Sequence, residues 1–211
     1  IHNWFHIQNK YKIEQGKTIM SEIQIIKRDG NKDTLDLEKL HKVVFYACDG
    51  INGVSASEVE IKSSLQFYSG ITSSEIQETL IKSAADLISE EQPNYQWVAG
   101  RLICYHLRKM VYGQFEPWHI LDLIKTNVEE GFYDSLLLEK YTEQEWEELN
   151  SHLKHERDER MTYAAMEQWR GKYLVQNRVT NIIKETPQMA YMLISATLFA
   201  EYPRETRLQC C

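Results

Sequence analysis

The stretch Ile26-Lys27-Arg28-Asp29-Gly30 decides the fold of the first half of the chain, together with Asp33-Thr34-Leu35-Asp36-Leu37-Glu38-Lys39-Leu40 after it. Asp-Gly between short apolar strands predicts a β-hairpin, because both residue types tolerate the positive φ of a two-residue turn. Asp36 stands at the N-cap of a helix whose apolar residues recur at helical spacing. We therefore expect Lys27, Arg28 and Lys39 to gather on one side of this unit and to hold an anion. A basic cluster alone is weak evidence, since most are solvated surface.

Three more helices are predicted before residue 113. Ser55-Ala56-Ser57-Glu58 has the pattern of a capping box and opens a helix that Gly70 ends. Thr72-Ser73-Ser74-Glu75 is a second capping box, ahead of apolar residues at helical spacing. Pro93 suits the start of a fourth helix that runs to Tyr112. With the helix over 37–50, the fold predicted here is mainly α, a four-helix unit under a small β-sheet lid.

The second half is predicted to be helical as well. Helices are expected over 120–129, from the capping box Thr142–Glu145 to about 154, and over 160–169. The segments 173–175 and 182–184 are expected to pair as a short hairpin. A final helix over 189–200 is apolar nearly all round, which predicts burial on every side.

Composition limits the function classes. The chain has 211 residues, 43% apolar and 26% charged, and this indicates a soluble, globular protein of one or two domains. The net charge of −7 argues against a nucleic-acid binder. Its four cysteines have no C-x-x-C spacing, which suggests thiols of a reducing compartment. No run approaches the roughly 18 apolar residues of a membrane span. We expect a cytoplasmic protein that binds neither nucleic acid nor membrane.

Charged runs in the second half are assigned to surface. His152 and His155 with Glu156 have a spacing suited to a metal, but they lie in the charged run 154–160, so a solvated helix face is the stronger interpretation and no metal site is predicted. The acidic run Glu143–Glu148 is also interpreted as a helix surface.

Several motifs in order resemble one known family. The segments 27–30, 66–72 and 81–88 resemble the ATP-cone, the nucleotide-sensing domain at the N-terminus of ribonucleotide reductase large subunits. The match continues through 95–102 and 106–117, while 171–179 and 202–209 look like the segment before the catalytic barrel of class I enzymes. The resemblance spans roughly residues 20–209. It identifies the chain as similar to the large (alpha) subunit of class Ia ribonucleoside-diphosphate reductase.

The resemblance implies a domain organisation. Residues 20–113 correspond to the ATP-cone, and residues 114–211 to a helical segment leading to a catalytic barrel that is missing here. Residues 1–19 precede Met20 and are expected to be a disordered upstream extension. The chain stops after Cys210 and Cys211, which we interpret as an accidental end of a partial chain.

The resemblance also implies an effector site. No G-x-x-x-x-G-K-[ST] loop is present, so a P-loop is excluded. Lys27, Arg28, Lys39 and Lys109 match family positions that contact phosphates, and 33–39 matches the segment around the nucleoside. The expected effector-binding residues are Lys27, Arg28, Asp33, Thr34, Leu35, Asp36, Leu37, Glu38, Lys39, Ser73, Gln77 and Lys109.

Three of these positions depart from the family pattern. Ser73 stands where Thr is found, Gln77 where His is found and Asp36 where Asn is found. Gln77 keeps hydrogen bonding but removes a titratable ring. Asp36 puts a negative charge near a polyanion, unless it caps the helix or faces away. ATP binding is expected; whether dATP inhibits is left open.

The implied function is regulatory. The family reduces ribonucleoside diphosphates to deoxyribonucleoside diphosphates, with a radical supplied by a di-iron small subunit and with self-association of large subunits. None of its catalytic motifs lies in residues 1–211, so no catalytic residue is assigned and this chain alone is expected to be inactive. It is expected to bind ATP or dATP, with Mg²⁺, as overall-activity effector and to hold no catalytic cofactor. The alternative is a stand-alone ATP-cone module without catalysis.

Overall fold

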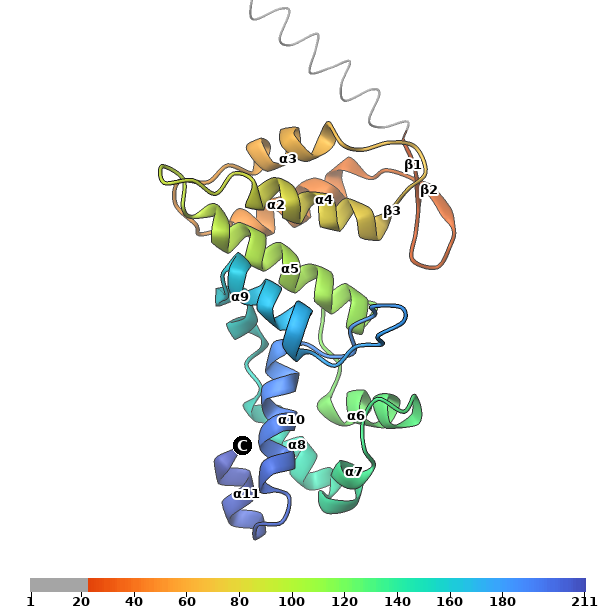
Figure 1. Cartoon of the computed structure of the whole chain (residues 1–211), viewed down its shortest axis with the longest axis vertical. Helices are drawn as coiled ribbons and strands as arrows, with labels where there is room; N and C mark the ends of the chain where they lie inside the picture. The colour runs from red at the N-terminus through yellow and green to blue at the C-terminus, as the bar shows by residue number, and fades with distance from the viewer. Residues whose placement is uncertain (1–22) are drawn as a thin grey trace, which may run out of the picture. The chain divides into compact units, whose positions relative to one another are not determined.

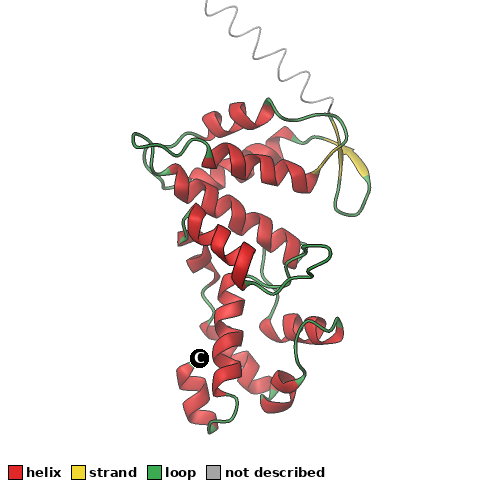
Figure 2. Cartoon of the chain, viewed as in Figure 1, coloured by secondary structure: helices red, strands yellow, loops and turns green. Residues whose placement is uncertain are grey.

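The computed structural model describes residues 23–211 (Figure 1). The chain divides into two compact units, Ile1–Leu102 and Ile103–Cys211, and the division falls inside helix α5 (Tyr95–Val111). Helices dominate, and the three-stranded sheet is small (Figure 2), so the mainly α prediction is confirmed. The extension predicted over 1–19, and Met20, lie outside the described residues.

The first unit contains the predicted hairpin with a different turn. Strand β1 (Gln24–Ile26) pairs antiparallel with β2 (Lys32–Thr34), and Ile26 lies opposite Lys32. The amide of Gly30 donates to the carbonyl of Lys27 at 2.9 Å, and Gly30 has φ +82°. The amide of Lys27 also donates to the carbonyl of Asn31 at 2.8 Å, so residues 28–30 form the loop inside this pair. It is a β-turn followed by a left-handed glycine, and the predicted two-residue turn was wrong. Asp29 explains the longer loop, because its carboxylate accepts hydrogen bonds from the backbone and side-chain amides of Asn31.

A third strand was not predicted. Strand β3 (Ile71–Thr72) pairs parallel with β1, so the sheet order is β2-β1-β3. Gly70, with φ +94°, donates its amide to the carbonyl of Gln24 at 2.7 Å and leads the chain into this strand. Because the pairing is parallel, the end of β1 and the end of β3 lie at the same edge of the sheet.

The first unit also holds α2 (Leu37–Cys48), α3 (Ala56–Ser64), α4 (Ser73–Ala85) and the first part of α5. The predicted capping box at the start of α4 is confirmed, since Thr72 and Glu75 bond reciprocally. The core of the unit consists of the apolar faces of these elements: Val44, Ala47, Val59, Ile71, Leu80, Ile81, Ala84, Tyr95, Val98 and Leu102 are among its most buried residues.

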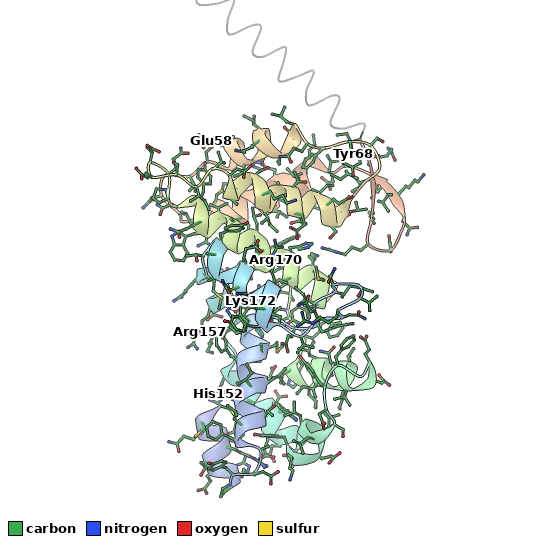
Figure 3. The ribbon with its side chains drawn as sticks, viewed as in Figure 1. Glu58, Tyr68, His152, Arg157, Arg170 and Lys172 are labelled. Carbon is green, nitrogen blue, oxygen red and sulfur yellow. The ribbon has the colours of Figure 1, made fainter. Side chains whose placement is uncertain are left out.

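The capping box predicted at the start of α3 was wrong. Ser55 is the N-cap, but its side chain makes no capping bond. The amide of Ser55 donates instead to the hydroxyl of Tyr95 at 2.9 Å, and that hydroxyl donates to Glu58, which is labelled in Figure 3. Glu58 is thus held by a residue 37 positions later and does not reach back to Ser55.

The second unit is a series of helices of mixed type. It contains α6 (Ile120–Glu129), α7 (Leu136–Lys140), α8 (Glu143–His152), the 3₁₀ helix η1 (His155–Arg160), α9 (Tyr163–Gln168), the π-helical turn η2 (Trp169–Tyr173), α10 (Pro187–Phe199) and α11 (Arg204–Cys210). The bounds of α6 and the capping box of Thr142 and Glu145 are confirmed. The helix predicted over 160–169 is broken into η1, α9 and η2, while α7 and α11 were not predicted. Packing is densest around Trp146, Ile120, Ile124, Met189 and Ala196, which are completely buried.

The hairpin predicted over 173–175 and 182–184 forms only as a single antiparallel bridge between Gln176 and Ile183. Asn181, with φ +57°, turns the chain between the two segments. Backbone bonds from Asn177 to Ile182 and from Lys184 to Val175, both of 2.9 Å, flank this bridge, while the amide of Val175 donates to the carboxylate of Glu185 at 2.9 Å.

Two charged side chains that were assigned to surface are buried. Glu145 is 1% exposed because it completes the capping box of α8 and also accepts hydrogen bonds from Arg207. Burial raises the pKa of Glu145, yet the bonds from Thr142 and Arg207 bring it below the ordinary value overall. Asp158 is also 1% exposed and lies within 3.5 Å of the amide of Gln188 in the first turn of α10. The surface interpretation was wrong at these two positions, where partners distant in sequence cover the charge.

Candidate nucleotide-binding site

The basic hairpin is tied together by an ion pair across its two strands. The ammonium of Lys27, just after β1, pairs with the carboxylate of Asp33 on β2. Both side chains are about half exposed, at 47% and 51%. The hydrogen bond between them raises the pKa of Lys27 and lowers the pKa of Asp33. An anion that binds Lys27 has to compete with this carboxylate. Arg28 is exposed at the tip of the same loop.

The segment that follows β2 caps helix α2. The Oδ1 atom of Asp36 accepts a hydrogen bond from the amide of Lys39 at 3.0 Å. Asp36 was expected either to cap the helix or to face away from the ligand, and the structure shows that it caps the helix. Its bond satisfies one of the backbone amides that have no partner inside the first turn of α2. The Lys39 side chain is exposed in this first turn, as is that of Glu38.

Residues 33–37 alternate between solvent and core. Asp33 and Thr34 are exposed, Leu35 is 6% exposed, and Leu37 is partly buried. The hydroxyl of Thr34 accepts a hydrogen bond from the side-chain amide of Gln24 at 3.2 Å. Because Leu35 belongs to the core, only its backbone is available to a ligand at the surface.

Helix α4 begins beside the hairpin. The parallel pairing of Ile26 with Thr72 brings the N-terminus of α4 to the end of β1. The hydroxyl of Ser73 donates to the carbonyl of Ile26 at 3.3 Å, next to Lys27 in the chain. The backbone thus holds Ser73 and Lys27 at one edge of the sheet.

Gln77 lies one helical turn after Ser73, on the same face of α4. Its side-chain oxygen is buried and has no hydrogen-bond partner among residues 23–211. A buried amide oxygen without a partner is unfavourable, and a ligand amino or hydroxyl group satisfies it. This acceptor therefore fits a nucleoside, which offers both kinds of donor group.

The N-terminus of α4 already carries a negative charge. Glu75 accepts hydrogen bonds from the amide and hydroxyl of Thr72, and these bonds lower the pKa of the Glu75 carboxyl. Its carboxylate complements the helix dipole at this end. A phosphate at this end would meet that carboxylate, so its attraction would come from the cations of the hairpin and of α2 more than from the dipole of α4.

Specific contacts link several of the predicted residues. Lys27 pairs with Asp33, and the charge of Lys39 is among the causes that lower the pKa of Asp33. Ser73 is bonded to the carbonyl that precedes Lys27, and Gln77 follows Ser73 by one turn of α4. Lys109 belongs to the second unit, on the last turn of α5, where its ammonium lies 6.0 Å from the centre of the Tyr105 ring. Its place in the site stays a prediction.

Sequence reasoning missed the strand that organises this site. Strand β3 sets Ser73 beside the hairpin, and its local signal was the β-branched pair Ile71-Thr72 after Gly70. The Lys27–Asp33 ion pair was also missed, although cross-strand opposite charges follow once the register is known.

No described helix has the length and apolar character needed to cross a membrane. Within residues 23–211, no three metal-ligating side chains group in a way that could hold an ion. His152 and His155 fall on different elements, α8 and η1.

Comparison with known proteins identifies the class of domain that this geometry forms. Residues 23–110 match the ATP cone domain. The chain is 51% identical over 185 residues to ribonucleoside-diphosphate reductase 1 subunit alpha of Escherichia coli, covering 88% of this chain and 24% of that protein. It is 48% identical over 186 residues to the alpha subunit of Haemophilus influenzae, with 88% and 25% covered, and 41% identical over 186 residues to that of Enterobacteria phage T4, with 87% and 24% covered.

Residues 23–110 are thus an ATP-cone domain. The chain is a homologue of the alpha subunits of ribonucleoside-diphosphate reductase, and it spans about a quarter of the length of the curated relatives it matches.

Proposed function

We propose that this chain is the nucleotide-sensing part of a ribonucleoside-diphosphate reductase alpha subunit and that the edge of its sheet binds ATP or dATP as an allosteric effector. The observation that carries the proposal is the unpaired oxygen of Gln77, inside an ATP-cone domain and one turn after Ser73, which is bonded to the carbonyl preceding Lys27. Cations, a hydroxyl and an unsatisfied amide are the groups that a nucleoside triphosphate needs.

Each group has a role in the proposal. Lys27, Arg28 and Lys39 bind phosphate oxygens, and Lys109 joins them from α5. The backbone of 33–39 surrounds the nucleoside, with Leu35 contributing only its main chain because its side chain is buried. Ser73 and Gln77 bind polar atoms of base or ribose. Mg²⁺ accompanies the triphosphate, since it prefers phosphate oxygens and water to a protein cage.

We also propose an activity for the longer alpha subunit to which this chain belongs. That subunit reduces ribonucleoside diphosphates in the cytoplasm, together with a di-iron small subunit, and it associates with further alpha subunits. Residues 1–211 alone bind the effector without reducing substrate. The nucleotide acts by its differential affinity for active and inhibited assemblies, which sets the coupling free energy.

Calorimetric titration of residues 1–211 with MgATP and with MgdATP tests this proposal. Lys27→Ala is expected to weaken both nucleotides by about tenfold or more, because a hydrogen bond to a charged group contributes about 1.5–3 kcal/mol and 1.4 kcal/mol is a factor of ten.

The matched control is Lys62→Ala. Lys62 also pairs with an aspartate, Asp86, at 3.7 Å, but Asp86 is the C-cap of α4, at the opposite end from Ser73. Lys62→Ala is expected to bind both nucleotides as the wild type does. Equal effects of the two substitutions, or no saturable binding by the wild type, contradict the proposal.

A further inference from the structure

The loop between α2 and α3 carries the sequence Asn52-Gly53, which the nucleotide site does not use. Asparagine is one of the thermolabile residue types. Its side-chain amide is open to attack by the backbone nitrogen of the next residue, and glycine hinders that attack least because it has no Cβ. Asn52 is the only asparagine of the sequence that precedes a glycine. The sequence therefore singles out this position for reaction.

Both reacting groups at this position are open to solvent. Asn52 and Gly53 are exposed. Within residues 23–211, the side chain of Asn52 makes no hydrogen bond, and the amide of Gly53 has no acceptor. Gly53 has φ +72°, and a Cβ placed on it would meet no atom within 4 Å. In the described part of the chain, neither a hydrogen bond nor crowding protects the side-chain amide from the Gly53 nitrogen.

The turn of the basic hairpin shows the opposite case. There Asp29 precedes Gly30, and the Asp29 carboxylate accepts hydrogen bonds from the backbone and side-chain amides of Asn31. The amide of Gly30 donates to the carbonyl of Lys27 at 2.9 Å. Both groups that would have to react with each other are therefore held by other partners. The loop between α2 and α3 has neither restraint.

We propose that Asn52 is a site of spontaneous deamidation in the folded chain. The nitrogen of Gly53 bonds to the side-chain carbon of Asn52, and the side-chain nitrogen leaves as ammonia, carrying the proton that the Gly53 nitrogen gives up. Water then opens the cyclic imide at either of its two carbonyl carbons. One opening leaves aspartate at position 52, and the other leaves isoaspartate. No redox step is involved, and the proposal is independent of nucleotide binding.

The two products differ in how the loop is held. The Nδ2 atom of Asn94, just before α5, donates to the backbone carbonyl of Asn52 at 2.9 Å. The aspartate form keeps this carbonyl and adds one negative charge to a chain of net charge −7. In the isoaspartate form the backbone runs through the former side chain and gains a methylene, and the carbonyl becomes part of a free carboxylate. Asn94 therefore loses its backbone acceptor only in the isoaspartate form.

Incubation of residues 1–211 at neutral pH, followed over time by peptide mass spectrometry, tests the proposal. The peptide that contains Asn52 is expected to gain the mass difference between a hydroxyl and an amino group before any other asparagine peptide does. Enzymatic methylation by an isoaspartyl carboxyl methyltransferase is expected to label part of this product. In Gly53→Asn the mass shift is expected to be lost, because Asn tolerates the left-handed backbone while its side chain crowds the attacking nitrogen.

A second variant tests the part played by the fold. Asn94→Asp keeps the size of the side chain and removes the donor to the Asn52 carbonyl. Ring closure requires the backbone at Asn52 to rotate, so loss of this bond is expected to speed deamidation several-fold. The matched control is Gln114→Glu, which removes another exposed donor to a backbone carbonyl, that of Glu116 at 3.0 Å, and is expected to leave the rate unchanged. Equal rates in Asn94→Asp and the wild type contradict the role given to the Asn94 bond.

The wild type unfolded in guanidinium chloride gives the reactivity of the same sequence without the fold. Deamidation at Asn52 in the unfolded chain, with none in the native chain, shows that the fold blocks the reaction and overturns the proposal. An unchanged rate in Gly53→Asn overturns it as well. Circular dichroism reports whether Gly53→Asn folds, and the comparison of native with unfolded wild type decides the matter if it does not. Calorimetry with MgATP keeps these results separate from the nucleotide proposal.

Discussion

The hydroxyl of Ser73 donates a hydrogen bond to the carbonyl of Ile26 at 3.3 Å and joins two segments that lie 47 residues apart in the sequence. This bond closes the edge of the sheet where β1 leads into the basic hairpin and β3 leads into α4. It makes the proposed nucleotide site a property of the fold of the first unit and not of the hairpin alone.

Ser73→Ala is expected to weaken ATP binding several-fold and to lower the free energy of unfolding by about 1 kcal/mol, the net contribution of an ordinary hydrogen bond. Ser73→Thr keeps the hydroxyl and is expected to restore both. Calorimetry and urea unfolding measure the two effects. Unchanged affinity in Ser73→Ala, with the stability loss present, contradicts a role in binding.

The substitution Asp36→Asn distinguishes the helix-capping role of Asp36 from the effect of its negative charge. Asn and Asp are about equally good N-caps, so the free energy of unfolding is expected to stay within about 0.5 kcal/mol of the wild type. Removal of a negative charge beside Lys39 is expected to strengthen binding of the triphosphate. Asp36→Ala, in contrast, loses the cap and is expected to destabilise the unit by about 1 kcal/mol. Weaker ATP binding by Asp36→Asn at unchanged stability speaks against this reasoning.

Asp158 is expected to make stability fall between about pH 4 and pH 7. Burial raises the pKa of its carboxyl to about 7, whereas the bonds from Gln188 and the charge of Arg108 lower it. The folded state therefore holds a proton that the unfolded state releases near its ordinary pKa of 3.8. The resulting stabilisation is complete below that value and is lost as the pH rises through about 7.

The comparison variant is Asp158→Asn, which cannot titrate. His155, whose pKa is lowered to about 4 mainly by burial, remains in both proteins, so the difference between their urea-unfolding curves isolates Asp158. The wild type is expected to lose more stability than Asp158→Asn over this range. Parallel pH profiles show that Asp158 does not titrate as argued.

The thiols are expected to differ in reactivity. Burial raises the pKa of Cys104 to about 12 and that of Cys48 to about 11, so both stay protonated at neutral pH. Cys210 is exposed. Titration of the native chain with a disulfide reagent should label Cys210 quickly, and Cys104 only in denaturant. Fast reaction of Cys104 in the native chain runs against the burial described above.

Local signals in the sequence were enough to predict the starts of three helices. Asp36, Thr72 and Thr142 were predicted as caps and act as caps, because a capping bond joins residues three apart. The bounds of α6 followed from its apolar spacing in the same way.

Features set by distant partners were not predictable locally. Strand β3 has two residues, and their partners in β1 lie 46 positions earlier. Burial of Glu145 depends on Arg207, and burial of Asp158 depends on the start of α10. The residues of the candidate site also differ in how far the sequence predicts them. Lys27, Arg28 and Lys39 could be predicted from the hairpin and the helix start after it. Ser73 and Gln77 were expected only from the family resemblance, because parallel pairing of β3 with β1 brings the start of α4 to the hairpin.

The most direct test of the nucleotide site follows the backbone amide resonances of residues 1–211 during titration with MgATP. The account predicts saturable shifts concentrated over 26–39 and 73–77, with α3 (Ala56–Ser64) nearly unaffected. Shifts that are absent, or that concentrate on α3 and leave the edge of the sheet unchanged, contradict it.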